Sequence, residues 1–401
     1  MEYYDVIVVG GGPIGCRVAK NLGRAGIKTI VLEAKSRIGY PNHCSGLVPP
    51  EFIDIGQVPH AMVLNHIKGA QVYSYKEDSF HFKRVTPYAV VIDRTKFDIF
   101  MEESARREHV QFLYNAYVSS IKLGEVSSLT LTSGKEFKAK VIVLATGAAN
   151  AVQKMLHIED RTTTIFTAQV DVDLPLNDPE IAYIYMNNSI AHNWFSWAIP
   201  TDGGCARVGF GSVYGKNILN SLDMLFSNWS ILKNAKRRSP PVVWSIPTGI
   251  REKTVFETLL LVGDAANQIK PFSGGGLLTG FLSADVLTTC IIDALKQSSY
   301  KTFLQTLAKY EKAWRRLLQG EFKKEILLRD VFTTLTDEDK ALVIQKIERG
   351  KAQHIIGEYG FMDKPSIAGL KLLFSFKEIP LLYIKRKVFL KDKRRSNEDN
   401  F

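Results

Sequence analysis

Cysteine is scarce in this chain, and its four copies lie far apart. They form no Cys-x-x-Cys pair, which argues against structural zinc and a disulfide framework, so no metal is expected. Long apolar runs are also missing: no stretch approaches the roughly 20 uncharged apolar residues that a membrane-spanning helix needs. The start of the chain lacks the basic and apolar regions of a signal peptide. These absences predict a cytoplasmic protein.

Hydrophobic residues make up 45% of the 401 residues, which is enough for a large core and two domains. The net charge is +11, and much of the excess lies in the segment IKRKVFLKDKRR at residues 384–395. This segment is either a solvated basic tail or a surface for anionic lipid headgroups or a phosphate-bearing substrate, because apolar residues interleave with its charges. No nucleic-acid-binding module accompanies it, so nucleic acid is not an expected partner.

Hydrophobic periodicity predicts a βαβ unit at the N-terminus and further buried strands later in the chain. The expected elements are a strand at 4–9, a helix at 13–25, and strands at 29–33, 141–145 and 258–262, with a helix at 276–296.

Residues 10–15 read Gly-Gly-Gly-Pro-Ile-Gly and fit the pattern GxGxxG between the first strand and the first helix. Gly10 permits a tight turn after the strand. Gly12 lets the backbone approach a pyrophosphate, and Gly15 lets the helix pack close to the sheet. The pattern therefore predicts dinucleotide binding.

The first turn of this helix contains Pro13 and Ile14, and its exposed N–H groups would face the phosphates. Glu33 ends the second strand and is followed by Ala34. A carboxylate at this position can accept hydrogen bonds from ribose hydroxyls. The motif by itself does not distinguish FAD from NAD.

A second stretch favours FAD. The strand at 258–262 ends in Gly-Asp, and a glycine-rich loop at 271–276 opens the next helix. This resembles the second flavin-contacting motif of the para-hydroxybenzoate-hydroxylase-like flavoproteins. The resemblance implies that Asp264 holds the ribityl chain and that the loop lies near the flavin pyrimidine, where N–H donors stabilise the charge of reduction. The alternative is an ordinary glycine-rich turn. The implied cofactor residues here are Gly263, Asp264, Gly274, Gly275, Gly276 and Leu277.

Two more pieces resemble elements of the same flavoproteins. The turn after the strand at 141–145 resembles the element near the adenine half of the cofactor, and it contains Ala145, Thr146 and Gly147. Arg94 resembles the arginine that packs beside the cofactor. Its alternative role is a surface salt bridge with Asp93 or Asp98.

The predicted fold class is α/β (α+β): a Rossmann-like FAD-binding domain, an inserted and mostly antiparallel β-sheet domain, and a C-terminal helical region. Aromatic residues, prolines and alternating segments mark the inserted strands, and helical spacing follows Tyr300. The boundaries are 1–60, 91–154 and 251–299 for the FAD-binding domain, 61–90 and 155–250 for the substrate domain, and 300–401 for the helices and basic tail.

A more specific resemblance, from Tyr4 to about residue 345, is to the geranylgeranyl reductases, including the archaeal enzymes that saturate the isoprenoid chains of membrane lipids. Residues 41–48, PNHCSGLV, are similar to that family's cysteine motif. The resemblance implies that Cys44 contacts the flavin. Its thiol could tune the flavin, donate a proton or gate the site. The alternative for Cys44 is a small buried hydrophobe. His43 is expected to be structural or solvated.

Residues 195–200, FSWAIP, are similar to the family's Tyr-x-Trp-x-Phe-Pro element, which lines the substrate cavity. The implied substrate-binding residues are Phe195, Trp197 and Pro200, and the alternative is an ordinary core strand. Phe195 replaces the family's tyrosine, so it supplies no hydroxyl for proton donation. Residues 310–315, YEKAWR, resemble a helical segment that is expected to be structural.

The resemblance implies an FAD-dependent enzyme that saturates carbon–carbon double bonds of an isoprenoid lipid or prenyl diphosphate by proton addition and hydride transfer. The sequence has no second GxGxxG motif and therefore no separate Rossmann domain for NAD(P)H. The expected electron donor is either NAD(P)H, bound without such a domain, or a ferredoxin. The basic segment predicts peripheral contact with the inner face of the membrane. The rivals are a flavin-dependent halogenase, an aromatic monooxygenase and a non-catalytic FAD-binding protein.

Overall fold

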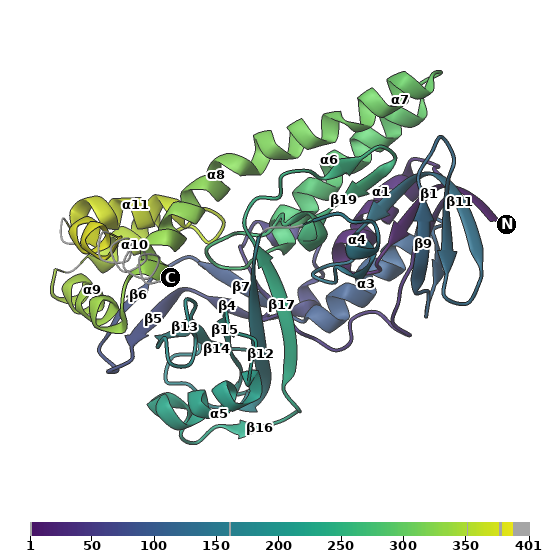
Figure 1. The fold of residues 1–401 in the computed structure, drawn as a ribbon. Coiled ribbons are helices and arrows are strands. Elements are labelled where there is room, and N and C mark those ends of the chain that lie inside the picture. Colours follow the sequence, from purple (N-terminus) through teal and green to yellow (C-terminus); the bar gives the residue numbers. More distant parts are fainter. Residues whose placement is uncertain (1, 160–161, 351, 377–378, 388–401) are drawn as a thin grey trace, which may run out of the picture.

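The computed structural model describes residues 2–159, 162–350, 352–376 and 379–387. Over these residues the protein is a mixed α/β fold, in which helices pack around two large β-sheets and one small sheet (Figure 1). The predicted fold class is therefore confirmed. The domain boundaries stay a prediction.

The first sheet is built on parallel strands. β1 (Glu2–Val9) pairs in parallel with both β11 (Glu136–Leu144) and β2 (Thr29–Leu32). Its order is completed by β18 (Val255–Phe256) and β19 (Leu259–Leu261) beyond β11, by β8 (Gln111–Leu113) beyond β2, and by the antiparallel pair β9 (Val118–Lys122) and β10 (Ser127–Leu131). Strands covered on both faces need apolar residues throughout, which explains the continuous apolar runs.

Alternate residues of β1 pack on opposite sides of this sheet. Val6 and Val8 pack with the helices, whereas Ile7 and Val9 pack with β9, β10 and α4 (Ala151–Met155). The helical side is formed by α1 (Pro13–Arg24) and α6 (Leu277–Leu295), and α3 (Arg94–Arg107) packs against α1. The turn from β1 into α1 thus lies at the carboxyl end of the central strand.

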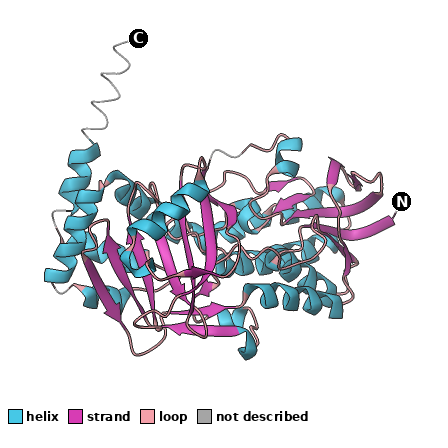
Figure 2. Cartoon of the chain, turned by 90° about the horizontal axis from the view of Figure 1, so that it is seen from below, coloured by secondary structure: helices cyan, strands magenta, loops and turns pink. Residues whose placement is uncertain are grey.

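The second sheet is mostly antiparallel, with only β13 and β5 pairing in parallel. Its order is β16 (Lys236–Arg237), β12 (Thr163–Asp173), β15 (Cys205–Ser212), β14 (Ser196–Pro200), β13 (Ile181–Met186), β5 (Gly69–Ser74) and β6 (Ser79–Lys83), with β17 (Val242–Thr248) also beside β12. Figure 2 shows these strands side by side from below. One face is covered by α5 (Ile218–Asn228) and η2 (Ser230–Leu232). On the other face, Ala182 and Ile199 pack with Ala89 and Val91.

A small third sheet is formed by strands that flank β5 and β6 in the chain. It consists of β3 (Leu47–Val48), β7 (Ala89–Ile92) and β4 (Val63–Ile67), and it is flanked by α2 (Phe52–Ile55) and η1 (His60–Met62). Its core residues Phe52, Val90 and Ile92 pack with Phe97 of α3 and Phe281 of α6. The segment that contains Cys44 enters this sheet directly.

The C-terminal helices connect the two large sheets. They are α7 (Tyr300–Leu307), α8 (Lys309–Thr334), α9 (Asp337–Arg349), α10 (Gln353–Tyr359) and α11 (Ser366–Ser375). α8 runs from α7, beside α6, to the cluster of α9, α10 and α11 next to β5 and β6 (Figure 1). Tyr310 donates to the carbonyl of Leu261 (3.0 Å), and Trp314 donates to Thr254 Oγ1 (2.9 Å). These fully buried contacts agree with a structural role for the segment at 310–315.

Helix α6 is apolar but not free of charge, since it contains Asp285 and Asp293. Among the described residues, it is long and apolar enough to cross a membrane by length and composition alone. More than half of that stretch is buried inside the protein, where Leu287 and Ile291 pack in the main core. Its Asp285 forms an ion pair with Arg17 of α1 (2.7 Å), which fits a core helix of a folded domain.

Candidate flavin site

The turn between β1 and α1 has the geometry that the GxGxxG pattern predicts. Gly10 has φ +107°, and a Cβ there would collide with the carbonyl of Ala145. A Cβ on Gly15 would collide with the carbonyl of Gly10. A Cβ on Gly12 would meet nothing within 4 Å, which leaves space in front of the start of α1. Gly10 and Gly15 are therefore needed for close packing of the backbone, whereas Gly12 borders open space in front of the helix.

The start of α1 suits an anion. Gly12 supplies no side-chain cap, and the first turn, which contains Pro13 and Ile14, holds no acidic residue. Free N–H groups and the positive end of the helix dipole therefore remain for a phosphate. Glu33 lies at the rim and accepts hydrogen bonds from the backbone N–H of Gly11 (2.6 Å) and of Lys35 (2.8 Å). Ala34 lies between Glu33 and Lys35 in the chain and follows β2.

The turn after β11 packs against the dinucleotide loop. Ala145 borders both Gly10 and Gly15, and its N–H bonds to the carbonyl of Val9 (2.8 Å). Thr146 donates its hydroxyl to the carbonyl of Ala149 (2.8 Å). Gly147 has φ +62°, which favours glycine, and a Cβ there would meet nothing within 4 Å.

The third stretch meets the same region from β19. Gly263 has φ +68° and packs against Ile14, so η3 (Gly263–Ala266) lies beside the start of α1. Asp264 lies against Gly276, whose Cβ would be 3.1 Å from Asp264 Oδ1. Burial raises the pKa of Asp264 to about 6, against the opposing charge of Arg94.

The loop after η3 is closed by its own backbone. Lys270 N–H donates to the carbonyl of Gly275 (3.1 Å), and Gly274 N–H donates to the carbonyl of Lys270 (2.9 Å). α6 then begins at Leu277 without a side-chain cap or an acidic residue in its first turn. The three stretches thus converge, and their free N–H groups, the carboxylate of Glu33 and the space before Gly12 fit a dinucleotide cofactor.

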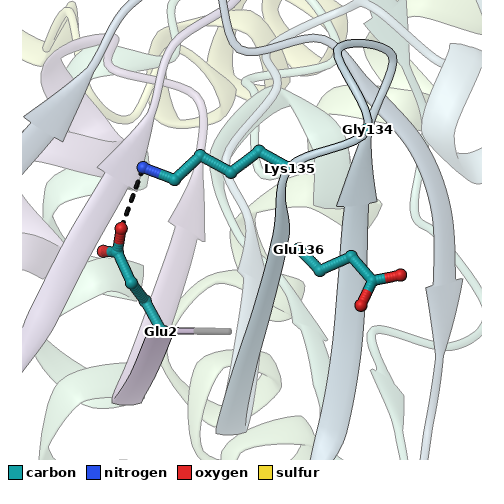
Figure 3. Close-up of a pocket in the computed structure, with 4 residues that line it drawn as sticks. All are labelled: Glu2, Gly134, Lys135 and Glu136. Carbon is teal, nitrogen blue, oxygen red and sulfur yellow. Dashed lines mark ion pairs between the residues drawn. The ribbon is translucent and has the colours of Figure 1, made fainter.

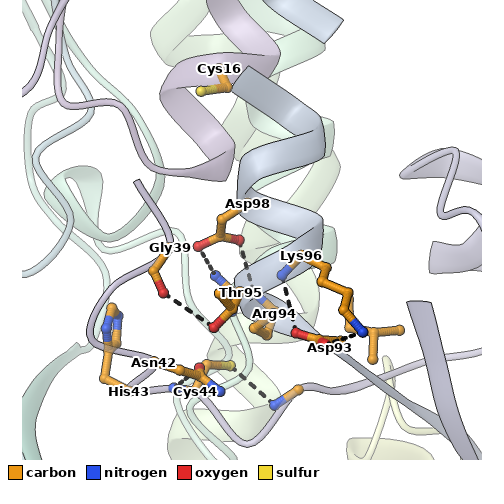
Figure 4. A network of polar contacts seen from close by, with 12 residues as sticks. Cys16, Gly39, Asn42, His43, Cys44, Asp93, Arg94, Thr95, Lys96 and Asp98 are labelled. Carbon is orange, nitrogen blue, oxygen red and sulfur yellow. Dashed lines mark hydrogen bonds and ion pairs between the residues drawn. The ribbon is translucent and has the colours of Figure 1, made fainter. Parts of the chain in front are cut away.

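The loop at residues 41–46, the Cys44 loop, lies beside the first turn of α3, as Figure 4 shows. Cys44 N–H donates to Asn42 Oδ1 (3.2 Å), and Cys44 Sγ accepts from Gly46 N–H (3.4 Å). The loop is fastened to the second sheet, because Gln169 Nε2 donates to the carbonyl of Cys44 (3.3 Å) and Arg207 Nη1 donates to that of Ser45 (2.8 Å). It therefore joins the nucleotide-binding part to the second sheet.

Arg94 forms the ion pair with Asp98 that its alternative role predicted, but the pair is buried and does not lie at the surface. Arg94 forms two contacts with Asp98, at 3.1 and 3.2 Å, and both residues are less than 10% exposed. Burial disfavours the guanidinium charge, but Asp98 and Cys44 outweigh it and raise the pKa of Arg94. Its positive charge is thus held between Cys44, Asp98 and Asp264.

His43 is an aromatic partner in the structure. Its ring stacks on Trp244 with centroids 4.0 Å apart, and Lys35 lies over the same indole. Burial, followed by the charge of Arg94, lowers the pKa of His43 to about 4. The imidazole is therefore neutral at pH 7, in agreement with the structural role expected for it.

Trp197 of the predicted substrate segment lies on the face of the second sheet that is opposite α5, whereas Pro200 pairs with Ala206 and lies on the α5 side. Phe195 contacts the rings of Trp194 and Trp197. Gly209 of β15 makes room for Trp197, since a Cβ there would be 2.7 Å from the indole, and Gly211 does the same for Trp194. The result is an aromatic wall that includes Phe195 and Trp197.

Two polar atoms in this wall are buried without a hydrogen-bond partner, Trp197 Nε1 and Gln169 Oε1. Both residues oppose Gly209 in the sheet register, so they share one row and one face. Pro200 ends β14, and its carbonyl accepts from Asn65 (3.2 Å). Sequence reasoning missed Gln169, although glycines at alternate positions of a strand were a usable signal of close packing on that face.

A small open pocket lies away from these residues. It is lined by Glu2, Gly134, Lys135 and Glu136, at the turn between β10 and β11, and contains the ion pair of Lys135 with Glu2 (2.9 Å) (Figure 3). None of the predicted site residues lines it. It is a surface feature of the hairpin.

Comparisons with known proteins show which proteins the chain as a whole is similar to. A family model described as lycopene cyclase protein matches residues 5–204. An uncharacterised protein of Methanocaldococcus jannaschii is 27% identical over 93% of this chain and 95% of its own length. Digeranylgeranylglycerophospholipid reductase 1 of Methanosphaera stadtmanae is 26% identical over 85% of this chain and 87% of its own length.

Solved structures share the fold. A geranylgeranyl bacteriochlorophyll reductase-like protein from Thermoplasma acidophilum superposes with a TM-score of 0.82 at 22% identity, covering 96% of this chain and 100% of the other. The flavin-dependent brominase Bmp2 superposes with a TM-score of 0.69 at 15% identity, covering 94% and 98%. The resemblance to the geranylgeranyl reductases is confirmed, and the chain is an enzyme, an oxidoreductase.

Proposed function

We propose that this enzyme is an FAD-dependent reductase that saturates carbon–carbon double bonds of a geranylgeranyl or related isoprenoid chain, carried on a lipid or a diphosphate. The observation that carries the proposal is the set of hydrogen bonds between the Cys44 loop and the second sheet. Gln169 and Arg207 fasten the Cys44 loop to the sheet that presents Trp197, so a substrate on the aromatic wall would lie next to that loop.

The choice of FAD rests on this chain's own residues. The free N–H groups before α1 would hold a pyrophosphate, and Glu33 would accept from ribose hydroxyls. Asp264 would hold the ribityl chain, and the loop at 271–276 would lie at the pyrimidine end. Similar relatives carry the name digeranylgeranylglycerophospholipid reductase, which supports an isoprenoid substrate.

Bound and reduced FAD would supply a hydride to the substrate. An isolated alkene is a poor hydride acceptor, so the protein must also deliver a proton and exclude water. Phe195 and Trp197 would supply apolar walls for the chain, and Cys44 is our proton-donor candidate. The electrons come from NAD(P)H or a ferredoxin.

Anaerobic turnover tests this function. The flavin-loaded protein is reduced with dithionite, freed of excess reductant and mixed with a geranylgeranyl lipid or diphosphate. We expect the oxidised flavin absorbance to return without oxygen, and mass spectrometry to find a product heavier by two hydrogens per double bond. The fully saturated lipid is the control and should leave the flavin reduced.

Paired cysteine variants test the proton donor in the same assay. Cys44→Ser should slow reoxidation by about 100-fold, the usual effect of losing a general acid, whereas Cys290→Ser on α6 should not. Equal rates for Cys44→Ser and wild type would remove Cys44 as the donor. A wild-type flavin that stays reduced until air is admitted would contradict the reductase proposal and favour the halogenase or monooxygenase, with halide dependence separating those two.

We also propose that the protein is cytoplasmic and meets its substrate at the inner face of the membrane. Phe374, Leu381 and Ile384 are more than half exposed, and they lie in the last described helices. Arg386 and Lys387 are engaged within the protein by Asp339 (2.8 Å) and Asp330 (2.9 Å). Lys385 is exposed, and the remaining basic residues of the 384–395 segment lie outside the described residues.

A charge variant tests membrane contact without removing those ion pairs. Replacing Lys391, Lys393, Arg394 and Arg395 with serine should weaken binding to vesicles rich in anionic phospholipid by up to about 1000-fold, since each of the four cations near such a surface contributes about 1 kcal/mol. Binding to neutral vesicles is the control and should not change. Co-sedimentation that is the same for variant and wild type on anionic vesicles would refute the proposal.

A further inference from the structure

Helix α8 contacts the loop at 271–276 through one row of side chains. Glu325, Arg329 and Phe332 are spaced i, i+4 and i+7, so they lie on one face of the helix. Glu325 accepts from the N–H of Phe272, Arg329 Nη1 donates to the carbonyl of Pro271 (3.5 Å), and the Phe332 ring meets that of Phe272 edge to face. A helix far along the chain thus holds the loop assigned to the flavin.

Arg329 also connects this row to the aromatic wall. Its guanidinium lies 4.4 Å from the centre of the Trp194 ring, and Trp194 lies beside Gly274 of the loop. Burial lowers the pKa of Arg329 to about 10, so it stays charged at neutral pH. The loop is therefore fixed from behind by a cation and a carboxyl group on neighbouring turns of α8.

Glu325 is the unusual member of the row. It is fully buried, its Oε2 accepts from Phe272 N–H at 3.0 Å, and its Oε1 has no hydrogen-bond partner. A buried carboxylate with an unpaired oxygen is costly, so such a group tends to take up a proton. Burial raises the pKa of Glu325 to about 7, while Phe272 N–H and Lys270 oppose that change.

Lys270 provides the charge that faces Glu325. It is 3% exposed, and its Nζ donates to the carbonyl of Met362 (2.6 Å). Its stem runs along the loop, since a Cβ on Gly275 would be 2.8 Å from Lys270 Cε. The other charged groups that act on Glu325 are Glu321 of the same helix and Asp363 of the segment before α11.

We propose that Glu325 is a positioning residue that holds the loop at 271–276 for the flavin and sets the charge behind it. This inference rests on the flavin site of the proposed function. When the carboxyl carries a proton, the positive charge of Lys270 behind the loop is not balanced by Glu325. When it is ionised, it cancels much of that charge. The loop should therefore favour an anionic reduced flavin most strongly when Glu325 is protonated.

The sign of the pH dependence follows. Glu325 is protonated below about pH 7 and ionised above it. In the wild type, the ratio of the affinity for reduced flavin to that for oxidised flavin should fall between pH 6 and pH 8.5. This fall should be about tenfold larger than the fall in Glu325→Gln. A tenfold change in this ratio equals a shift of about 30 mV in the two-electron midpoint potential. Glu325→Gln keeps the hydrogen-bond acceptor but is neutral at both pH values, so it should lack this extra step.

The experiment measures midpoint potential and oxidised-flavin affinity of the full-length protein at pH 6 and 8.5. Glu321→Gln is the matched control, because Glu321 lies one turn earlier and contacts Ser366 instead of the loop. It should keep the extra step between pH 6 and pH 8.5, with the midpoint at a lower pH because the charge of Glu321 no longer raises the pKa of Glu325. Glu325→Ala removes the acceptor for Phe272 and should weaken flavin binding by about tenfold, the value of one hydrogen bond to a charged group.

The outcomes separate this inference from the function on which it rests. If wild type and Glu325→Gln change in parallel between the two pH values, the charge role of Glu325 is refuted, whatever the substrate is. If Glu325→Ala binds flavin as well as wild type, the positioning role is refuted. A wild type that binds no flavin would overturn the proposed function and this inference together.

Discussion

Gly12→Val is expected to abolish tight flavin binding and to leave the apoprotein folded. Gly12 has φ −65° and ψ 174°, which any residue adopts, and its Cβ would meet nothing within 4 Å. The new side chain would instead fill the space before the free N–H groups of α1. Losing two hydrogen bonds to a charged phosphate, at about 1.5–3 kcal/mol each, corresponds to at least a 100-fold weaker affinity. Flavin titration and apoprotein melting measure the two effects.

Two glycine variants are the controls for this prediction. Gly320 lies on an exposed part of α8, and a Cβ there also meets nothing within 4 Å, so Gly320→Val should change neither affinity nor melting. Gly15→Ala should instead lower the melting temperature of the apoprotein, because its Cβ would collide with the Gly10 carbonyl. Unchanged flavin affinity in Gly12→Val would show that the cofactor does not approach this turn.

Arg94→Ala should destabilise the protein by about 3–5 kcal/mol at pH 8, because it leaves Asp98 buried without its partner. Burial already raises the pKa of Asp98, although Arg94 opposes this. A carboxyl whose pKa is higher in the folded than in the unfolded state loses stability as pH rises between the two values. Removing Arg94 raises the folded pKa further, so the loss should be smaller at pH 5. Urea unfolding of the apoprotein at both pH values measures it.

The same helix supplies a matched control. Arg107 pairs with Glu103 at the surface of α3, with side chains 71% and 56% exposed. Arg107→Ala should cost about 0.5 kcal/mol or less, as exposed pairs do. The double variant Arg94→Ala with Asp98→Ala should recover part of the loss, because no buried charge remains. A loss below 1 kcal/mol in Arg94→Ala would show that Asp98 finds another partner or stays protonated.

The sequence by itself determined the helices that follow the two glycine-rich loops. The helix expected at 13–25 spans Pro13–Arg24, and the one expected at 276–296 spans Leu277–Leu295. These elements depend on local signals: apolar runs for buried strands, and glycines where the backbone needs a positive φ or a close approach. Because Gly10 and Gly263 each sit at the end of a parallel strand, their convergence at one edge of the sheet could also be inferred.

Only the tertiary structure decided which groups surround that site. Glu325 contacts Phe272, Gln169 contacts Cys44 and Arg207 contacts Ser45. These pairs are separated by 53, 125 and 162 positions in the chain, respectively. No local periodicity encodes such contacts, because they arise where separate elements pack. The same packing buries Arg94 and covers α6, whose composition alone suits a membrane. Burial depends on the whole fold, and so do the charges and pKa values that the site acquires from it.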